Sequence, residues 1–121
     1  MAGPRVLVVD DSWTDLTLMA TALRQGGYDV LTASDGEAAL TMVETQRPDC
    51  IVLDIVLPHQ NGFQVCRHIK QTAHTSDIPV ILVSVKDTSL DQRWGFQQGA
   101  SLYLIKPFEP KELVRSVQSV L

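Results

Sequence analysis

The chain has 121 residues, of which 45% are hydrophobic and 20% charged, and its formal net charge is −4 at pH 7. This length suits one domain with one core, and the acidic balance argues against nucleic-acid binding driven by overall charge. No apolar run approaches the roughly 20 residues of a membrane span, and the start of the chain is not a secretory signal. We therefore expect one globular cytoplasmic domain over residues 1–121 that binds neither nucleic acid nor membrane.

The first half of the chain alternates β-rich runs with helical patterns. A strand is predicted over residues 5–9, and Gly26-Gly27 ends the helix that follows it. The apolar face of that helix repeats at i, i+3, i+4 and i+7, in Leu16, Met19, Ala20 and Leu23. A second strand is predicted over residues 28–33. The pattern Ser34-Asp35-Gly36-Glu37 is then a full capping box for a second helix.

The second half continues the same alternation. A strand over residues 50–53 is followed by Asn61-Gly62, which opens a third helix, and Pro79 introduces a fourth strand. Thr88 offers a cap for a fourth helix that ends at Gly99. The last strand and helix occupy the remaining residues. The apolar stripe of that helix is expected at Leu113, Val117, Val120 and Leu121.

Strands that alternate with single helices indicate βαβ units and a parallel sheet. Right-handed crossovers then place helices on both faces of that sheet. We expect an α/β fold, a flavodoxin-like, doubly wound (βα)5 sheet of five parallel strands in the order 2-1-3-4-5. The chain ends within the last helical pattern, so it is either a complete single-domain protein or a piece cut just after this domain.

Polar side chains follow four of the predicted strands. Asp10 and Asp11 follow the first, Asp54 the third, Ser84 the fourth and Lys106 the fifth. The carboxyl ends of parallel strands lie along one edge of a sheet, where ligands bind. Carboxylates gathered there repel one another unless a cation lies among them, and Mg²⁺ is the cation that suits hard oxygen ligands and phosphate chemistry. The sequence therefore predicts a magnesium site at this edge.

The same residues can support phosphoryl chemistry. An aspartate beside Mg²⁺ can act as a nucleophile toward phosphorus, while Lys106 neutralises charge and Ser84 donates a hydrogen bond to a phosphoryl oxygen. Each residue alone also has a structural explanation. Asp10 and Asp11 would cap a helix, and Ser84 would be a turn residue. Their joint placement after four strands favours the functional interpretation, because four independent coincidences are much less probable than one.

Other conspicuous residues carry weaker signals. His59, His68 and His74 lack zinc-ligand spacing. The two cysteines lack C-x-x-C spacing, so both are expected to be buried, reduced thiols. Trp94 is interpreted equally well as part of an interaction surface or as helix packing, and for Phe96 we expect packing.

Taken together, these motifs resemble the receiver domain of two-component response regulators, close to the single-domain chemotaxis regulators. The resemblance covers essentially the whole chain. The combination of motifs is highly specific, although no single one is. The matching segments are residues 8–12 (VVDDS), 52–58 (VLDIVLP) with Gly62, 79–84 (PVILVS) and 99–108 (GASLYLIKPF). Residues 91–100 are also similar to receivers of type IV pilus motility systems, in twitching or phototaxis.

The resemblance implies specific roles for the site residues. It implies that Asp54 accepts a phosphoryl group from a histidine kinase or a histidine phosphotransfer protein. It implies Mg²⁺ held by Asp10, Asp11, Asp54 and the backbone carbonyl of Val56. Ser84 and Tyr103 would form the switch pair, Lys106 would contact the phosphoryl group, and the Lys106-Pro107 bond would be cis.

The function expected from this resemblance is a signalling switch that catalyses only its own phosphoryl transfer and dephosphorylation. Phosphorylation would reshape the face made by the fourth helix, fifth strand and fifth helix for a downstream protein. Three alternatives differ in sequence. A phosphatase with an aspartyl nucleophile commonly carries D-x-D after its first strand. A flavodoxin-type cofactor binder would have a Ser/Thr/Gly-rich phosphate loop there, and a pseudo-receiver would lack the full acidic set with Lys106.

Overall fold

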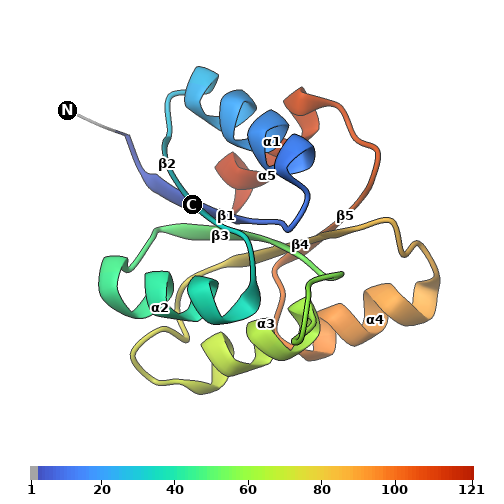
Figure 1. Ribbon diagram of the computed structural model, residues 1–121. Helices are drawn as coiled ribbons and strands as arrows, with labels where there is room; N and C mark the ends of the chain where they lie inside the picture. Colours follow the sequence, from blue (N-terminus) through green and yellow to red (C-terminus); the bar gives the residue numbers. More distant parts are fainter. Residues whose placement is uncertain (1–2) are drawn as a thin grey trace.

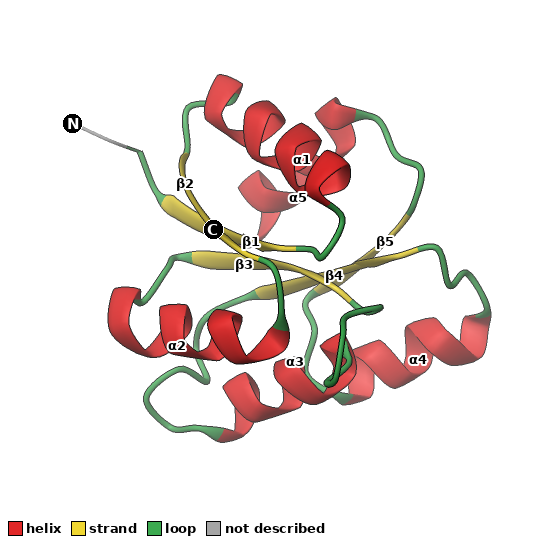
Figure 2. Ribbon diagram, in the orientation of Figure 1, coloured by secondary structure: helices red, strands yellow, loops and turns green. Residues whose placement is uncertain are grey.

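A five-stranded parallel sheet lies at the centre of the protein, and helices cover both of its faces (Figures 1 and 2). The computed structural model describes residues 3–121. The strands are β1 (Arg5–Val9), β2 (Asp29–Ala33), β3 (Cys50–Asp54), β4 (Val80–Ser84) and β5 (Leu102–Ile105). The helices are α1 (Trp13–Gln25), α2 (Gly36–Gln46), α3 (Gly62–Gln71), α4 (Ser89–Gln97) and α5 (Pro110–Val120).

The strand order is β2-β1-β3-β4-β5, which confirms the predicted doubly wound topology. The register brings the strand ends level with one another. Val9 pairs with Leu53, and Asp54 pairs with Val83, one residue before Ser84. Asp10, which follows Val9, and Asp54, which follows Leu53, therefore lie side by side at the carboxyl ends of β1 and β3.

The sheet is buried on both faces, which explains why its strands are nearly continuous apolar runs. In β1, Val6 and Val8 point toward the layer formed by α1 and α5, while Leu7 and Val9 pack toward α2 and α3. Figure 1 shows α1 and α5 on one side of the sheet and α2, α3 and α4 on the other. The hydrophobic clusters on the two faces of the sheet therefore hold the strands, and with them the strand ends, in place.

Side-chain caps begin four of the helices. Ser12, Asn61 and Thr88 cap α1, α3 and α4. The predicted capping box at Ser34 is wrong by one residue, because Asp35 has the extended backbone of a cap and its carboxylate accepts from the Ala38 N–H at 2.7 Å. An aspartate next to a serine competes for the same orphan donors, and here the backbone geometry favours the aspartate.

Two predictions about buried faces are also wrong. Leu121 follows the end of α5 and is exposed, so the stripe rests on Leu113 and Val117, with Val120 only partly buried. Phe96 is about half exposed, at 48%, and does not serve as helix packing. The reason lies in Gly95, where an added Cβ would come within 2.9 Å of Leu82 Cδ1 and 3.1 Å of Tyr103 Cδ2. Because α4 touches the sheet at this glycine, the side chains on either side of it splay outward.

Cys50 and Cys66 are both free and buried, as predicted. Burial raises the pKa of the Cys50 thiol to about 12 and that of Cys66 to about 11, so both stay protonated at neutral pH. Within residues 3–121, none of the helices has the length and apolar character required to cross a membrane.

Gly62 allows α3 to start directly against the end of β3. Its N–H donates to the Ile55 carbonyl at 2.8 Å, and a Cβ at this position would collide with the Asp54 carbonyl oxygen and lie 2.7 Å from Ile55 Cα. Gly62→Ala is therefore expected to reduce the free energy of unfolding by about 1–3 kcal/mol, because backbone atoms cannot move aside as a side chain can. Urea unfolding measures this, with Gln71→Ala on the exposed surface of α3 as the control. Equal midpoints for the two variants would contradict the steric argument.

Candidate functional site

The predicted carboxylates meet at one end of the sheet. Asp10 follows β1, Asp54 is the last residue of β3, and one carboxylate oxygen from each of Asp10, Asp11 and Asp54 lies within 4.8 Å of the others. Asp10 and Asp54 are 1% and 6% exposed, whereas Asp11 faces solvent. Two buried acids and one exposed acid therefore form an acidic pocket that is accessible from solvent at Asp11.

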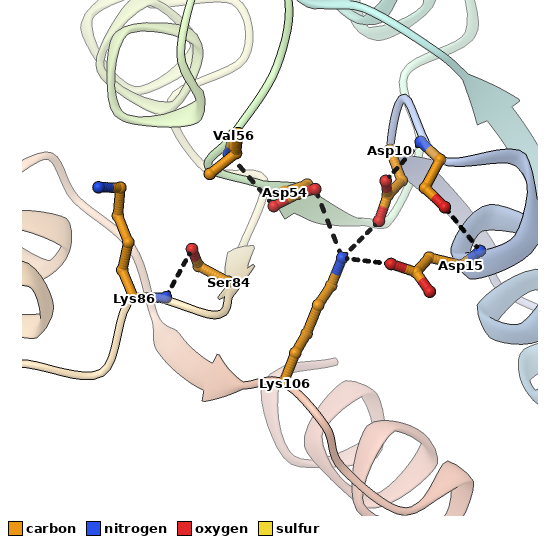
Figure 3. A network of polar contacts seen from close by, with 8 residues as sticks. Asp10, Asp15, Asp54, Val56, Ser84, Lys86 and Lys106 are labelled. Atoms are coloured by element: carbon orange, nitrogen blue, oxygen red, sulfur yellow. Dashed lines mark hydrogen bonds and ion pairs between the residues drawn. The ribbon is translucent and has the colours of Figure 1, made fainter.

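The ammonium group of Lys106 lies in the middle of the buried acids (Figure 3). Its Nζ is 2.7 Å from Asp10 Oδ2 and 3.4 Å from Asp54 Oδ2. A third carboxylate, Asp15 Oδ2, lies 3.1 Å from the same Nζ. Asp15 was not predicted as a site residue. Its position in the first turn of the helix that follows Asp10 and Asp11 was the available signal.

Backbone donors fix the orientation of both buried carboxylates. Asp10 Oδ1 accepts from the Ser12 N–H at 2.9 Å, and Asp54 Oδ1 accepts from the Val56 N–H at 3.2 Å. Each acid thus uses one oxygen on the loop that follows it and directs the other toward Lys106 (Figure 3). The arrangement holds two carboxylate oxygens in the pocket at fixed positions.

The pocket holds more negative charge than positive charge. Burial, together with the nearby charge of Asp10, raises the pKa of Asp54 to about 6, although Lys106 and the Val56 N–H act in the opposite direction. For Lys106, burial alone would lower the pKa, but hydrogen bonds to Asp10 and Asp15 outweigh it and the pKa lies above its usual value. A permanent ammonium is thus surrounded by more negative charge than it neutralises.

This excess of carboxylate oxygens fits a divalent cation. Mg²⁺ prefers oxygen ligands and usually binds through one or two carboxylates while keeping several waters. The donor set of Asp10, Asp11 and Asp54 has that chemistry, and the exposure of Asp11 makes the set accessible from solvent. The structure places the Val56 N–H on Asp54. The Val56 carbonyl remains a predicted ligand.

Ser84 and Tyr103 meet through the backbone of a third residue. Ser84 is fully buried at the end of β4, and its Oγ accepts from the Lys86 N–H at 3.1 Å. The Tyr103 hydroxyl donates to the Lys86 carbonyl at 2.8 Å. The sequence did not indicate this role of the Lys86 peptide, because it depends on backbone position and not on residue type. The Lys106-Pro107 peptide bond is cis, as the resemblance implied.

The histidines do not add to the site. His59 lies in the loop after β3 with a φ of 67° and is exposed, and His68 and His74 are also exposed. In the described part of the chain, the one group of three or more acidic, histidine or cysteine residues suited to a metal is Asp10, Asp11 and Asp54.

Comparison with known proteins decides the family. The family model of the response regulator receiver domain matches residues 6–118. The chain belongs to this family. Receiver domains act in two-component signalling, where phosphorylation of an aspartate switches the binding of partner proteins, so this chain is a signalling switch.

Relatives of this receiver domain include short and long proteins. Protein PilH of Pseudomonas aeruginosa is 40% identical over 117 residues, which cover 97% of each chain. The alkaline phosphatase synthesis transcriptional regulatory protein PhoP of Bacillus subtilis is 42% identical over 97% of this chain. The chain spans 48% of the length of PhoP, and about half the length of most of the other curated relatives that it matches.

Solved structures show the same fold. The chemotaxis response regulator CheY4 of Vibrio cholerae superposes with a TM-score of 0.91 and 31% identity, covering 100% of this chain and 99% of that one. A response regulator of Chloroflexus aurantiacus, described as putative, gives 0.93 and 34% identity over 97% of this chain and 96% of that one. These similarities confirm the flavodoxin-like order of strands and helices.

Proposed function

We propose that Asp54 is the phosphoacceptor of this receiver domain and that residues 1–121 form one receiver domain. The observation that supports Asp54 is its contact with Lys106, which at 3.4 Å is the longest of the three ion pairs. Asp10 is more tightly neutralised, at 2.7 Å, and Asp11 is exposed. Asp54 is thus the buried carboxylate with the least compensated charge, which makes it the best nucleophile of the set.

The reaction follows from these positions. An Asp54 oxygen attacks the phosphorus of a phosphohistidine, the O–P bond forms as the N–P bond breaks, and the imidazole nitrogen leaves with the electron pair. Mg²⁺, held by Asp10, Asp11, Asp54 and the Val56 carbonyl, would supply neutralising charge for the phosphoryl oxygens. Lys106 adds its positive charge on the same group, and Ser84 donates a hydrogen bond to it. The domain therefore catalyses only its own phosphorylation and the hydrolysis of the phosphoryl group from Asp54.

The switch would pass through the backbone N–H and carbonyl of Lys86. If the Ser84 hydroxyl turns toward the phosphoryl group, it releases its hydrogen bond from the Lys86 N–H, and the backbone of Lys86 can shift. The Tyr103 side chain would then move too, because its hydroxyl is hydrogen-bonded to the Lys86 carbonyl. Tyr103 lies on β5 beside α4, where large apolar side chains are exposed. These are Leu90, Trp94 and Ile105. We propose the α4–β5–α5 face as the surface where a downstream protein reads phosphorylation.

The biological setting is inferred from the relatives. The similarity to PilH and CheY4 supports a role in motility, of the type IV pilus or chemotaxis kind, with a histidine kinase upstream. The net charge of −4 supports a protein partner for this domain in place of nucleic acid. The two buried, free thiols support a cytoplasmic location for this protein.

Mg²⁺ is expected to stabilise the domain, because it binds the folded cluster and not the unfolded chain. At a Mg²⁺ concentration 100 times its dissociation constant the gain is about 2.7 kcal/mol. Thermal unfolding with EDTA and with MgCl2 measures it, and the Asp11→Asn variant should gain less. Trp13 lies two residues from Asp11 and is 77% exposed, so its fluorescence offers a direct binding readout. Identical melting temperatures with and without Mg²⁺ would rule out the metal site.

The output face is tested by amide hydrogen exchange with beryllium fluoride as a phosphoryl mimic. Exchange is expected to change in the β4–α4 loop around Lys86 and in α4 and β5, as well as in the loop after Asp54. Tyr103→Ala, which loses the bond to the Lys86 carbonyl, should confine the change to the Asp54 loop. A wild-type response confined to that loop would count against the α4–β5–α5 face.

A further inference from the structure

Asp15 is a third carboxylate on Lys106, and nothing in the phosphoacceptor or metal assignments accounts for it. It comes from α1 and not from a strand end. Its Oδ2 lies 3.1 Å from Lys106 Nζ, closer than Asp54 Oδ2 at 3.4 Å. Figure 3 shows that Asp10, Asp15 and Asp54 each direct a carboxylate oxygen at this ammonium. The lysine is thus shared between the acidic pocket and the first turn of α1.

The placement of Asp15 is built into the start of α1. The cap residue Ser12 accepts from the Asp15 N–H at 3.3 Å, which sets the first turn, and the N–H of Ser12 in turn donates to Asp10. An acid in this turn would also suit the helix dipole, which is the ordinary reason for an aspartate there. That reason does not explain why the carboxylate lies on Lys106, since a solvated aspartate would satisfy the dipole equally well.

The surroundings strengthen this ion pair. Asp15 and Lys106 together border an apolar hollow of about 430 Å³, whose other walls include Leu18, Met19 and Phe108. The Lys106 side chain is only 15% exposed, whereas the Asp15 side chain is 43% exposed, so the apolar walls shield mainly the lysine. Such a half-buried pair is less screened by water than a pair on an open surface.

The other two partners of Lys106 are the carboxylates that a metal ion would use. Asp10 Oδ2 and Asp54 Oδ2 both point at Nζ, and both acids belong to the predicted Mg²⁺ set. The ammonium and a divalent cation therefore compete for the same acids. Asp15 lies outside that set of three, so it is the partner that Lys106 keeps when the metal takes the others.

We propose that Asp15 is a positioning residue for Lys106. It gives the ammonium a carboxylate partner outside the metal set, which lowers the competition with Mg²⁺ for Asp10 and Asp54, and it holds the ammonium beside the pocket, where an incoming phosphoryl group needs it. This inference rests on the roles proposed above for Asp54 and Lys106. It assigns to the first turn of α1 a part in metal binding and phosphoryl transfer.

A double-mutant cycle separates this role from a simple loss of charge. The four proteins are wild type, Asp15→Asn, Lys106→Met and the double variant, and the readouts are the Mg²⁺ dissociation constant and the rate of phosphorylation by a small-molecule phosphodonor. Asp15→Asn is expected to weaken Mg²⁺ binding about 5-fold and to slow phosphorylation by a similar factor, a size typical of coupled neighbours. In the Lys106→Met background, the same substitution should change Mg²⁺ binding less than about 2-fold.

Matched variants complete the test. Glu37→Gln removes the same charge from the first turn of α2 and is expected to leave both readouts at the wild-type value. Asp15→Glu keeps a carboxylate and should restore most of the lost affinity. If Lys106→Met does not fold, Lys106→Gln provides the second background. An equal effect of Asp15→Asn with and without Lys106 would overturn the proposal, because Asp15 would then act only as a distant charge.

The outcomes also distinguish this inference from the proposed function. If the wild type is not phosphorylated on Asp54, the assignment of the phosphoacceptor fails, while the Mg²⁺ cycle still tests Asp15. If Asp54 is phosphorylated and the cycle shows no coupling between positions 15 and 106, the role of Asp15 alone is wrong.

Discussion

Asp54→Asn is expected to abolish phosphorylation of the domain. The substitution preserves shape but replaces the nucleophilic carboxylate with an amide, whose oxygen is a far weaker nucleophile toward phosphorus. With a small-molecule phosphodonor and Mg²⁺, wild type should gain the mass of one phosphoryl group, and Asp54→Asn should gain none. Intact-protein mass spectrometry measures both. Asp77→Asn provides the control, since Asp77 is exposed and lies before β4, at the opposite end of the sheet from the pocket.

The neighbouring acids are expected to respond differently. Asp10→Asn and Asp11→Asn keep the nucleophile but weaken the metal site, so they should slow phosphorylation without moving it to another residue. Peptide mapping of the phosphorylated protein locates the group. A mass gain of the wild-type size in Asp54→Asn would show that another carboxylate is the acceptor, and Asp10 would then be the next candidate because it is the other buried carboxylate of the cluster.

Much of the fold could be predicted because its signals are local. The buried strands are nearly pure apolar runs, and the turn residues between them are explicit, so the parallel sheet could be predicted. The strand order came from the flavodoxin-like fold class, and the parallel strands then placed Asp10, Asp54, Ser84 and Lys106 at one edge. The resemblance added Tyr103, and the structure places its hydroxyl 2.8 Å from the Lys86 carbonyl.

The features that escaped prediction depend on three-dimensional placement. In the sequence, Asp15 is an ordinary acidic residue in the first turn of a helix, and only the structure shows that it lies beside Lys106. Phe96 reads as a buried aromatic, but α4 approaches the sheet through Gly95 and leaves its neighbours outside. The cap of α2 depended on which of two adjacent residues has the extended backbone, and that residue is Asp35. In each case residue type was compatible with two answers, and packing selected one.

Metal-free protein is expected to become less stable as pH rises from about 4 to about 7, because of Asp54. Its pKa in the folded protein is about 6, against an ordinary value of 3.8. Between these values the folded protein binds more protons than the unfolded chain, so the stabilising contribution is present below pH 4 and is lost as pH rises through 6. A difference of about two in pKa corresponds to a loss of about 3 kcal/mol in the free energy of unfolding at neutral pH.

The Asp54→Asn variant isolates this effect, because the amide cannot ionise and Lys106 keeps Asp10 and Asp15 as partners. With EDTA present, the variant should unfold with a free energy about 3 kcal/mol higher than wild type at pH 7.5 and nearly equal to it at pH 4. Urea unfolding across this range measures the difference, and subtracting the two curves removes the other titrating groups that they share. Mg²⁺ should erase the advantage of the variant, since the cation neutralises the wild-type cluster and finds one carboxylate fewer in the variant. A difference between the two proteins that is constant with pH would mean that Asp54 is not held in a repulsive pocket. In that case the stored repulsion could not be what draws a cation and a phosphoryl group to this edge of the sheet.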